Sequence, residues 1–229
     1  MAYTFGAEDI MAALGITAAD WEVQDSGSDR QQDWAQTEDN DGNVVAASET
    51  AHNDRSEKSI TLKAKAPAGG SVAFTLGGIG TSDVVITAFT AKETFNDNGT
   101  IQVTAHKHET SESGAAHAAT PVSEAISLTL GFGVLDKGTD ETYLGGTLKD
   151  CQSCELSGSV GKHVDKFSNQ GAFLVGASSG LRFECTEEYV DDGTGIAELT
   201  SPWTQDSQAV KTGNGDFYTR TVKAHAYSL

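Results

Sequence analysis

The sequence predicts a mainly β fold: a β-sandwich or barrel protomer with a short flanking helix and a long polar loop or arm. Composition is the first observation, because 25 Gly against only 3 Pro, with abundant Thr, Ser and Val, is typical of strands joined by glycine turns. The second is that several segments alternate apolar and polar residues with the period of two that a half-buried strand requires. The third is that one short stretch near the N-terminus has the spacing of an amphipathic helix.

The N-terminal region predicts this short helix and then a polar arm. The segment "AEDIMAALG" places apolar residues on one helical face and ends on a glycine that suits the position after a helix: Ile10, Met11, Leu14 and Gly15. Residues 21–50 are rich in Asp, Gln, Ser and Asn, which indicates an extended arm or a long hairpin with a turn at "NDGNVV". We therefore expect a single β domain over residues 1–229, with residues 20–57 as a candidate polar arm.

Three later strands follow one plan, with apolar residues on one face and Thr, Lys or His on the other. The apolar faces are Ile60, Leu62 and Ala64, then Ile101, Val103 and Ala105, then Val222, Ala224 and Ala226. The opposite faces are Thr61, Lys63 and Lys65, then Thr104, His106 and His108, then Thr221, Lys223 and His225. Because the plan is shared, we expect these strands in one curved sheet.

The remaining strand segments differ in how much of each we expect to be buried. "SDVVITAFTAKE" is apolar enough to be buried on both faces. "AISLTLGFGV" alternates at period two, and "GAFLVGASSGLRFECTEEYV" predicts two strands joined through "ASSG". The closing segment "YTRTVKAHAYSL" predicts a last strand with an uncovered edge. That edge, or the similar strand "TIQVTAHKHE", is the expected joint between copies of the chain.

Charge and hydropathy exclude several functions. The net charge is −18, which disfavours sequence-independent binding to nucleic acid or to an anionic membrane. Acidic residues crowd residues 20–41 and 184–198, as solvated loops usually do. The N-terminus lacks the pattern of a secretory signal, and no stretch has the roughly 18 apolar residues of a membrane span. We therefore expect a soluble, cytoplasmic product.

Three histidines lie close together in the sequence. His106 and His108, two apart on a predicted strand, project from the same face and could share a metal ion with His117, with Glu109 or Glu112 nearby. Equivalent faces of other strands carry Lys or a different His, however. A face that accepts both residue types is interpreted as a polar or subunit-facing surface, not as a coordination shell.

The three cysteines offer a second candidate. Cys151 and Cys154 form a Cys-x-x-Cys pair with His163 downstream and Cys185 later. A structural zinc site needs four well-spaced ligands, and a second Cys-x-x-Cys is missing. A redox pair is expected where a strand meets a helix, whereas this one precedes Gly and Ser residues. The interpretation is ordinary thiols at a loop edge.

Motifs for other chemistry are missing. The G-x-S-x-G match "GASSG", residues 176–180, runs into "LRFEC" and lacks the strand-to-helix context of a nucleophile elbow. The glycine pairs lack the Lys-Ser/Thr ending of a phosphate loop. Carboxylates are plentiful, but none pair as acid and base from sequence alone. We therefore assign no catalytic, cofactor-binding or metal-binding residue and expect a non-enzymatic protein without a cofactor.

The order of segments resembles that of the major tail tube proteins of long-tailed bacteriophages. The segments that carry the resemblance are "DGNVV", "ITLKAKA", "TIQVTAHKHETSESGAAHA", "AISLTLGFGVLD" and "TRTVKAHAYSL", mainly within residues 60–229. The resemblance implies a β protomer that assembles into stacked hexameric rings, with residues 20–57 as a candidate inter-ring loop. Its implied partners are copies of itself and other tail proteins. DNA would pass through an acidic lumen without specific binding, no membrane is involved, and the protein would lie in the virion after assembly from the host cytoplasm.

Three alternatives stay open. A baseplate, head-decoration or tail-completion protein of a virion would have the same β-rich, acidic sequence. A carbohydrate-binding β-sandwich would use aromatic platforms, for which Trp21, Trp34 and Trp203 are available in polar segments. A metalloenzyme would use His106 and the two histidines that follow it.

Overall fold

The computed structural model of the chain is mainly β, as predicted, and it describes most but not all of the chain. The described segments are residues 5–33, 36–41, 43–47, 52–65, 70–75, 84–94, 97–108, 127–132, 144, 151–167, 172–191, 199, 203–212 and 218–227. His117, Glu109, Glu112 and Trp34 lie outside them.

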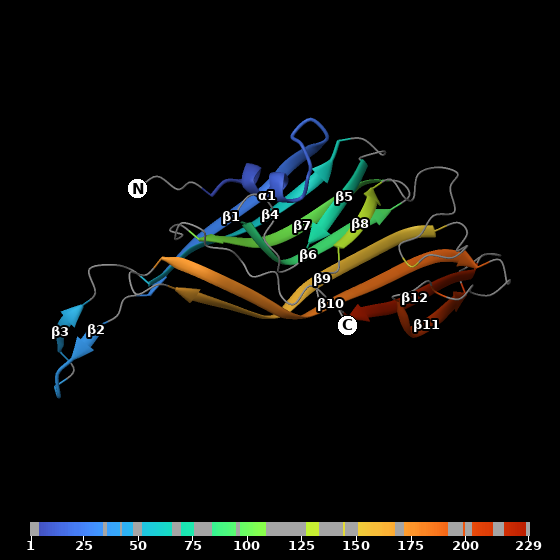
Figure 1. The fold of residues 1–229 in the computed structure, drawn as a ribbon. Helices are drawn as coiled ribbons and strands as arrows, with labels where there is room; N and C mark the ends of the chain where they lie inside the picture. Colours follow the sequence, from blue (N-terminus) through green and yellow to red (C-terminus); the bar gives the residue numbers. More distant parts are fainter. Residues whose placement is uncertain are drawn as a thin grey trace.

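Eight strands form one antiparallel sheet in the order β1-β4-β7-β6-β9-β10-β12-β11 (Figure 1). The bounds in that order are Trp21–Asp33, His52–Ala64, Asp97–His108, Val84–Thr94, Cys151–Phe167, Phe173–Asp191, Tyr218–Tyr227 and Thr204–Thr212. Two further antiparallel pairs join β2 (Gln36–Glu38) to β3 (Val44–Ala47) and β5 (Gly70–Thr75) to β8 (Ser127–Phe132). This arrangement is compatible with the predicted sandwich or barrel.

The predicted helix is α1, Ala7–Ala13. Its start is fixed by Asp9, whose Oδ2 accepts a hydrogen bond from the Gly6 N–H at 2.6 Å. After its end, Gly15 adopts a φ of +69°, which glycine tolerates far better than other residues. The face of α1 that carries Ile10 and Met11 is buried in the main core of the protein.

The main core lies on the sheet face that the alternating pattern predicted. All nine apolar residues of the three similar strands are buried: Ile60, Leu62, Ala64, Ile101, Val103, Ala105, Val222, Ala224 and Ala226. Leu156 of β9 and Phe183 of β10 extend the same core. In β6 the prediction of burial on both faces is confirmed only at the start, for Val84, Val85 and Ile86. From Phe89 onward the burial alternates, because the other side of β6 opens to solvent.

β10 is one long strand where two were predicted, and its partner β9 was not predicted as a strand. The "ASSG" segment, Ala177–Gly180, does not join two strands but lies inside the continuous strand β10. Both strands change direction near the middle (Figure 1), where Gly180 adopts a φ of +69° opposite Gly161. A Cβ on Gly161 would lie 2.9 Å from the Gly180 carbonyl oxygen. The two glycines therefore allow the backbones to approach closely and bend together.

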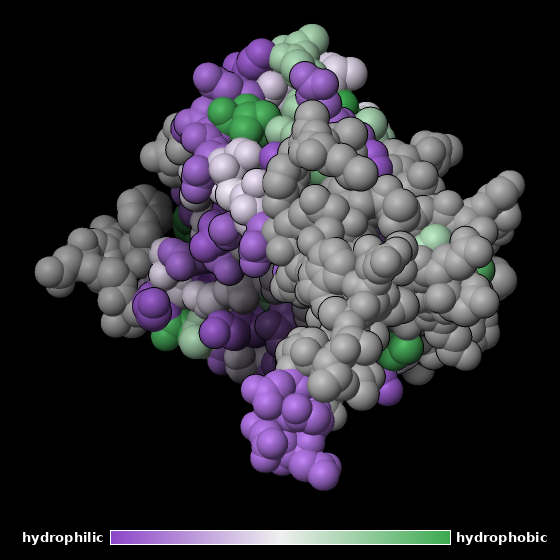
Figure 2. All heavy atoms as spheres, turned by 90° about the vertical axis from the view of Figure 1, so that its left-hand side faces the viewer, coloured by the Kyte–Doolittle hydropathy of each residue, from purple (hydrophilic) through white to green (hydrophobic). Residues whose placement is uncertain are grey.

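β1 and β4 form a long hairpin, one of the two structures predicted for the polar arm, and the β2–β3 pair lies toward its tip (Figure 1). The predicted turn at "NDGNVV" is present, because Asp39 Oδ1 accepts hydrogen bonds from the N–H groups of Asp41 (2.9 Å) and Asn43 (2.8 Å). Figure 2 views the molecule from the hairpin side, and its coloured residues are largely hydrophilic, including the group that projects at the bottom.

The prediction that β12 or β7 offers a free edge for joining copies of the chain is wrong. β12 lies between β10 and β11, and β7 lies between β4 and β6, so neither presents a free edge in the described sheet. The outer strands are β1 and β11. The error arose because β12 ends the sequence, whereas the strand that covers its edge, β11, comes just before it and pairs back as a hairpin.

Candidate functional site

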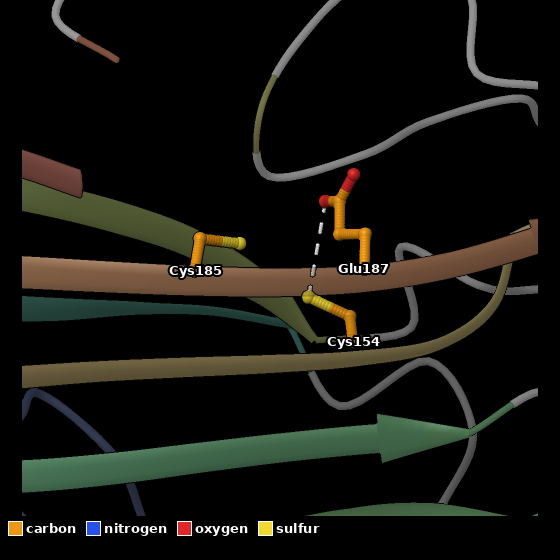
Figure 3. Close-up of side chains that lie close together, drawn as sticks. All are labelled: Cys154, Cys185 and Glu187. Carbon is orange, nitrogen blue, oxygen red and sulfur yellow. Dashed lines mark hydrogen bonds between the residues drawn. The ribbon is translucent and has the colours of Figure 1, made fainter. Parts of the chain in front are cut away.

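Three side chains that could serve as metal ligands lie close together inside the main core. Cys154 of β9 and Cys185 and Glu187 of β10 converge there (Figure 3), with their ligand atoms all within 4.8 Å of one another. All three residues are buried. Two thiols and a carboxylate in one buried space form the only such group of metal-type ligands among the described residues.

Strand register brings the three side chains together. Cys154 pairs directly with Glu187 across the antiparallel β9–β10 ladder. Cys185 precedes Glu187 by two residues, so both project from the same face of β10. The thiols of Cys154 and Cys185 are consequently diagonal neighbours across the two strands, not a directly opposed pair.

Hydrogen bonds hold the carboxylate in place. Glu187 Oε1 accepts a hydrogen bond from the Cys154 thiol, with an Sγ–Oε1 distance of 3.8 Å, drawn as the dashed line in Figure 3. The same oxygen accepts the backbone N–H of Leu144 at 3.2 Å. Glu187 and Leu144 are both 0% exposed. An amide brought from a distant part of the sequence therefore fixes the orientation of a carboxylate that no solvent reaches.

Two more residues border the cluster. Glu93 of β6 pairs directly with Cys154 on its other side, and it is also buried. Cys151, half-buried, pairs with Tyr189 at the start of β9, and its thiol donates to the Ser153 carbonyl oxygen at 3.5 Å. The three cysteines of the chain thus lie in one region of the sheet.

The environment raises the pKa of every thiol. Burial first, and then the charge of Glu187, raise the pKa of Cys151 to about 12. Burial and the hydrogen bond with Cys185 raise the pKa of Cys154 well above its ordinary value. The hydrogen bond with Cys154 lowers the pKa of Cys185, but burial and Glu187 outweigh it, so that this pKa is also raised. All three are therefore neutral thiols at pH 7 and poor nucleophiles.

The structure corrects the interpretation of the cysteines as thiols at a loop edge. Cys151 and Cys154 lie within β9, because the Gly and Ser residues that follow them continue the strand. The backbone of His163 lies nine residues beyond Cys154 on that strand, on the far side of Gly161 where β9 bends. Glu187 was predicted to lie in a solvated acidic loop at residues 184–198, and this is wrong, because it lies in β10 and is buried on the same strand face as Cys185.

The histidine face was predicted to be a polar or subunit-facing surface, and this is wrong for the protomer. His106 and His108 do share a face of β7, but both are buried. Their rings meet edge to face with centroids 5.3 Å apart, and the His108 ring stacks on Phe173. Val85, which pairs with His106, is buried beside it. The described residues of this face form a second, smaller packed region.

Trp21 and Trp203, the two tryptophans that the structure describes, do not form the platforms that a carbohydrate-binding alternative requires. Trp21 is 1% exposed and Trp203 is 9% exposed. Both contribute to the main core instead. A ring that binds sugar must present a face to solvent, so neither residue favours that alternative.

Comparisons with known proteins give no identification. No protein-family model matches the chain, and no curated protein matches it. Within the described segments, no helix has the length and apolar character needed to cross a bilayer.

Proposed function

We propose that the chain is a structural subunit of a phage tail tube, assembling into stacked hexameric rings around an acidic conduit for DNA. The observation that carries this proposal is the β1–β4 hairpin. β1 and β4 belong to the main sheet, but the β2–β3 pair at the tip of their hairpin is a separate two-stranded sheet that lies beyond it (Figure 1). Residues 22–29, 39–41 and 43, whose burial is described, are all exposed, and none of them belongs to the main core. The projecting β2–β3 pair is therefore available to contact a neighbouring copy of the chain.

The exposed side chains of β1 support this role. Trp21 anchors the start of the strand in the core, whereas the residues from Glu22 to Asp29 are exposed on both faces. Burial of side chains within the protomer therefore does not explain why all 13 residues of β1 are ordered as a strand. Packing against another copy would cover it and would offset the entropy of ordering these residues.

The edges of the main sheet support ring formation. β1 and β11 are the outer strands, and they lie at opposite ends of the strand order. Each exposes an apolar side chain, Val23 at 40% and Val210 at 49%. A head-to-tail contact between unlike edges of adjacent protomers closes into a ring and removes both edges.

The charge of the chain fits a conduit that DNA crosses without being held. With a net charge of −18 per protomer, a ring of several copies repels phosphates from its wall, whereas a basic lumen would bind them. Negative-stain electron microscopy of the purified full-length protein tests the proposal. We expect rings or tubes with a central channel. A protein that stays monomeric at all concentrations would contradict it, and solid particles without a channel would favour another virion component.

A further inference from the structure

We propose that Cys154, Cys185 and Glu187 bind a divalent metal ion that accepts sulfur ligands, with zinc as the natural example. The site would be structural, linking β9 to β10 inside the core. This inference is independent of tube assembly, because it depends only on the geometry within one protomer.

The donor set fits zinc. Zinc in proteins binds thiolate sulfur at about 2.3 Å and carboxylate oxygen at about 2.0–2.2 Å in a tetrahedral arrangement, which places ligand atoms roughly 3.5–3.8 Å apart. The three donor atoms already lie within 4.8 Å of one another. Closing on the ion therefore needs shifts of about 1 Å or less, which rotation of the side chains can supply.

A disulfide between the two thiols fits less well. Diagonal neighbours across an antiparallel ladder have Cα atoms about 7–8 Å apart, whereas disulfides need about 4.4–6.8 Å. Cys154 pairs with Glu187, and Cys185 pairs with Leu156, so the two cysteines are diagonal. Bridging them would pull the central strands out of register. A metal ion spans the gap without that change.

The surroundings of Glu187 resemble the support that metal ligands usually receive. The Leu144 amide donates to Oε1 and fixes the carboxylate, as outer hydrogen bonds do for ligating groups. Burying a carboxylate is costly, and pairing it with a cation offsets that cost. Cys151 does not belong to the group of ligand atoms that lie within 4.8 Å of one another, so water is the candidate for the fourth position.

The binding step balances in protons and charge. The ion displaces the S–H protons of Cys154 and Cys185, including the one now donated to Glu187, and both protons go to solvent. Two thiolates and one carboxylate then surround a divalent cation, leaving a net charge of one negative unit. A water molecule in the fourth position does not change this charge.

Cobalt titration of the full-length, reduced protein tests the site. We expect about one Co²⁺ per chain, with a thiolate-to-cobalt charge-transfer band and the intense visible bands of a tetrahedral site. Zinc should displace the cobalt and abolish these bands. Cys154→Ser and Cys185→Ser should remove the charge-transfer band or weaken binding at least about tenfold.

Glu187→Gln separates a metal role from a folding role, because glutamine keeps the shape and an oxygen acceptor for the Leu144 amide. We expect cobalt affinity to fall at least about tenfold while the circular dichroism of the metal-free protein is unchanged. The matched control is Glu188→Gln, on the opposite face of β10, which should bind cobalt like the wild type. The proposal is overturned if the wild type gives no charge-transfer band, if Glu187→Gln binds as tightly as Glu188→Gln, or if the isolated protein contains a Cys154–Cys185 disulfide.

Discussion

The ring of Phe173, at the start of β10, lies flat on the ring of His108, at the end of β7, with centroids 4.0 Å apart and planes 5° apart. Two strands separate β7 from β10 in the sheet order. The two rings therefore meet over the face of the sheet and do not belong to strands that pair with each other. This contact shows that the part of β10 that precedes the bend at Gly180 packs against the face of β7 that carries His106 and His108.

Phe173→Ala should destabilise the protein by about 3 kcal/mol, because the side chain is 2% exposed and its removal leaves a cavity against His108. Urea unfolding followed by circular dichroism measures this change. The control is Leu174→Ala, which removes an adjacent side chain that is 40% exposed and should change stability by less than about 1 kcal/mol. Equal effects of the two variants would contradict the packing described for the histidine face.

The bend in the β9–β10 hairpin gives a second prediction. Gly161→Ala should destabilise the protein by about 1–3 kcal/mol, because its new methyl group would lie 2.9 Å from the Gly180 carbonyl oxygen. Gly27→Ala in β1 is the control, since a Cβ there meets nothing within 4 Å. Thermal melting of both variants measures the difference. A Gly161→Ala protein as stable as the control would mean that the two strands do not approach closely at the bend.

The internal position of β12 gives a third prediction. Ala224 pairs with Cys185 on one side and Gln205 on the other, and its side chain is 1% exposed. Ala224→Asp should therefore unfold the protomer, with a loss of more than about 4 kcal/mol, because it buries a charge in the main core. Lys223→Asp, at the exposed neighbouring position, should stay folded, as the circular dichroism of each variant will show. Deleting Ala224–Leu229 should likewise unfold the chain and not merely separate subunits.

The core could be predicted from the sequence because its signal is local. Ile60, Val103 and Val222 each lie in a segment whose alternation fixes which face is buried, whatever its neighbours are. The continuity of β10 could not be predicted in this way. Gly180 follows two serines and adopts a positive φ, and such a pattern indicates a turn far more often than a bend inside a long strand.

The candidate site could not be predicted because it depends on register between distant segments. Cys154 and Glu187 are 33 residues apart, and only the β9–β10 pairing makes them neighbours. The burial of His106 depends in the same way on tertiary packing, since a strand face rich in Thr, Lys and His is usually exposed. In both cases the sequence shows the residue types, but a local pattern does not show which distant side chains surround them in the folded chain.

The buried thiols give a fourth prediction. In the native, metal-free protein, Cys154 and Cys185 should not react with a thiol reagent such as dithionitrobenzoate, because both are buried and burial contributes to the raised pKa of each. Both should react after unfolding in guanidinium. Cys151, half-buried with a pKa of about 12, should react only slowly in the native state. Mass spectrometry of the labelled protein identifies the sites, and rapid native labelling of Cys154 would contradict the burial of the cluster.

The final prediction separates the role of the hairpin in assembly from its role in folding. Arg30 and Ser56 are register partners in the β1–β4 ladder, so a two-residue Asn-Gly turn can replace residues 31–55 without changing the pairing below them. The buried residues at the base of the hairpin, Trp21, Ile60 and Leu62, are retained. We expect this variant to fold with a melting temperature close to that of the wild type but to form no stacked tubes under the electron microscope. Tubes of normal length from the shortened protein would show that the hairpin does not join the rings, and loss of the folded state would show that it serves the protomer itself.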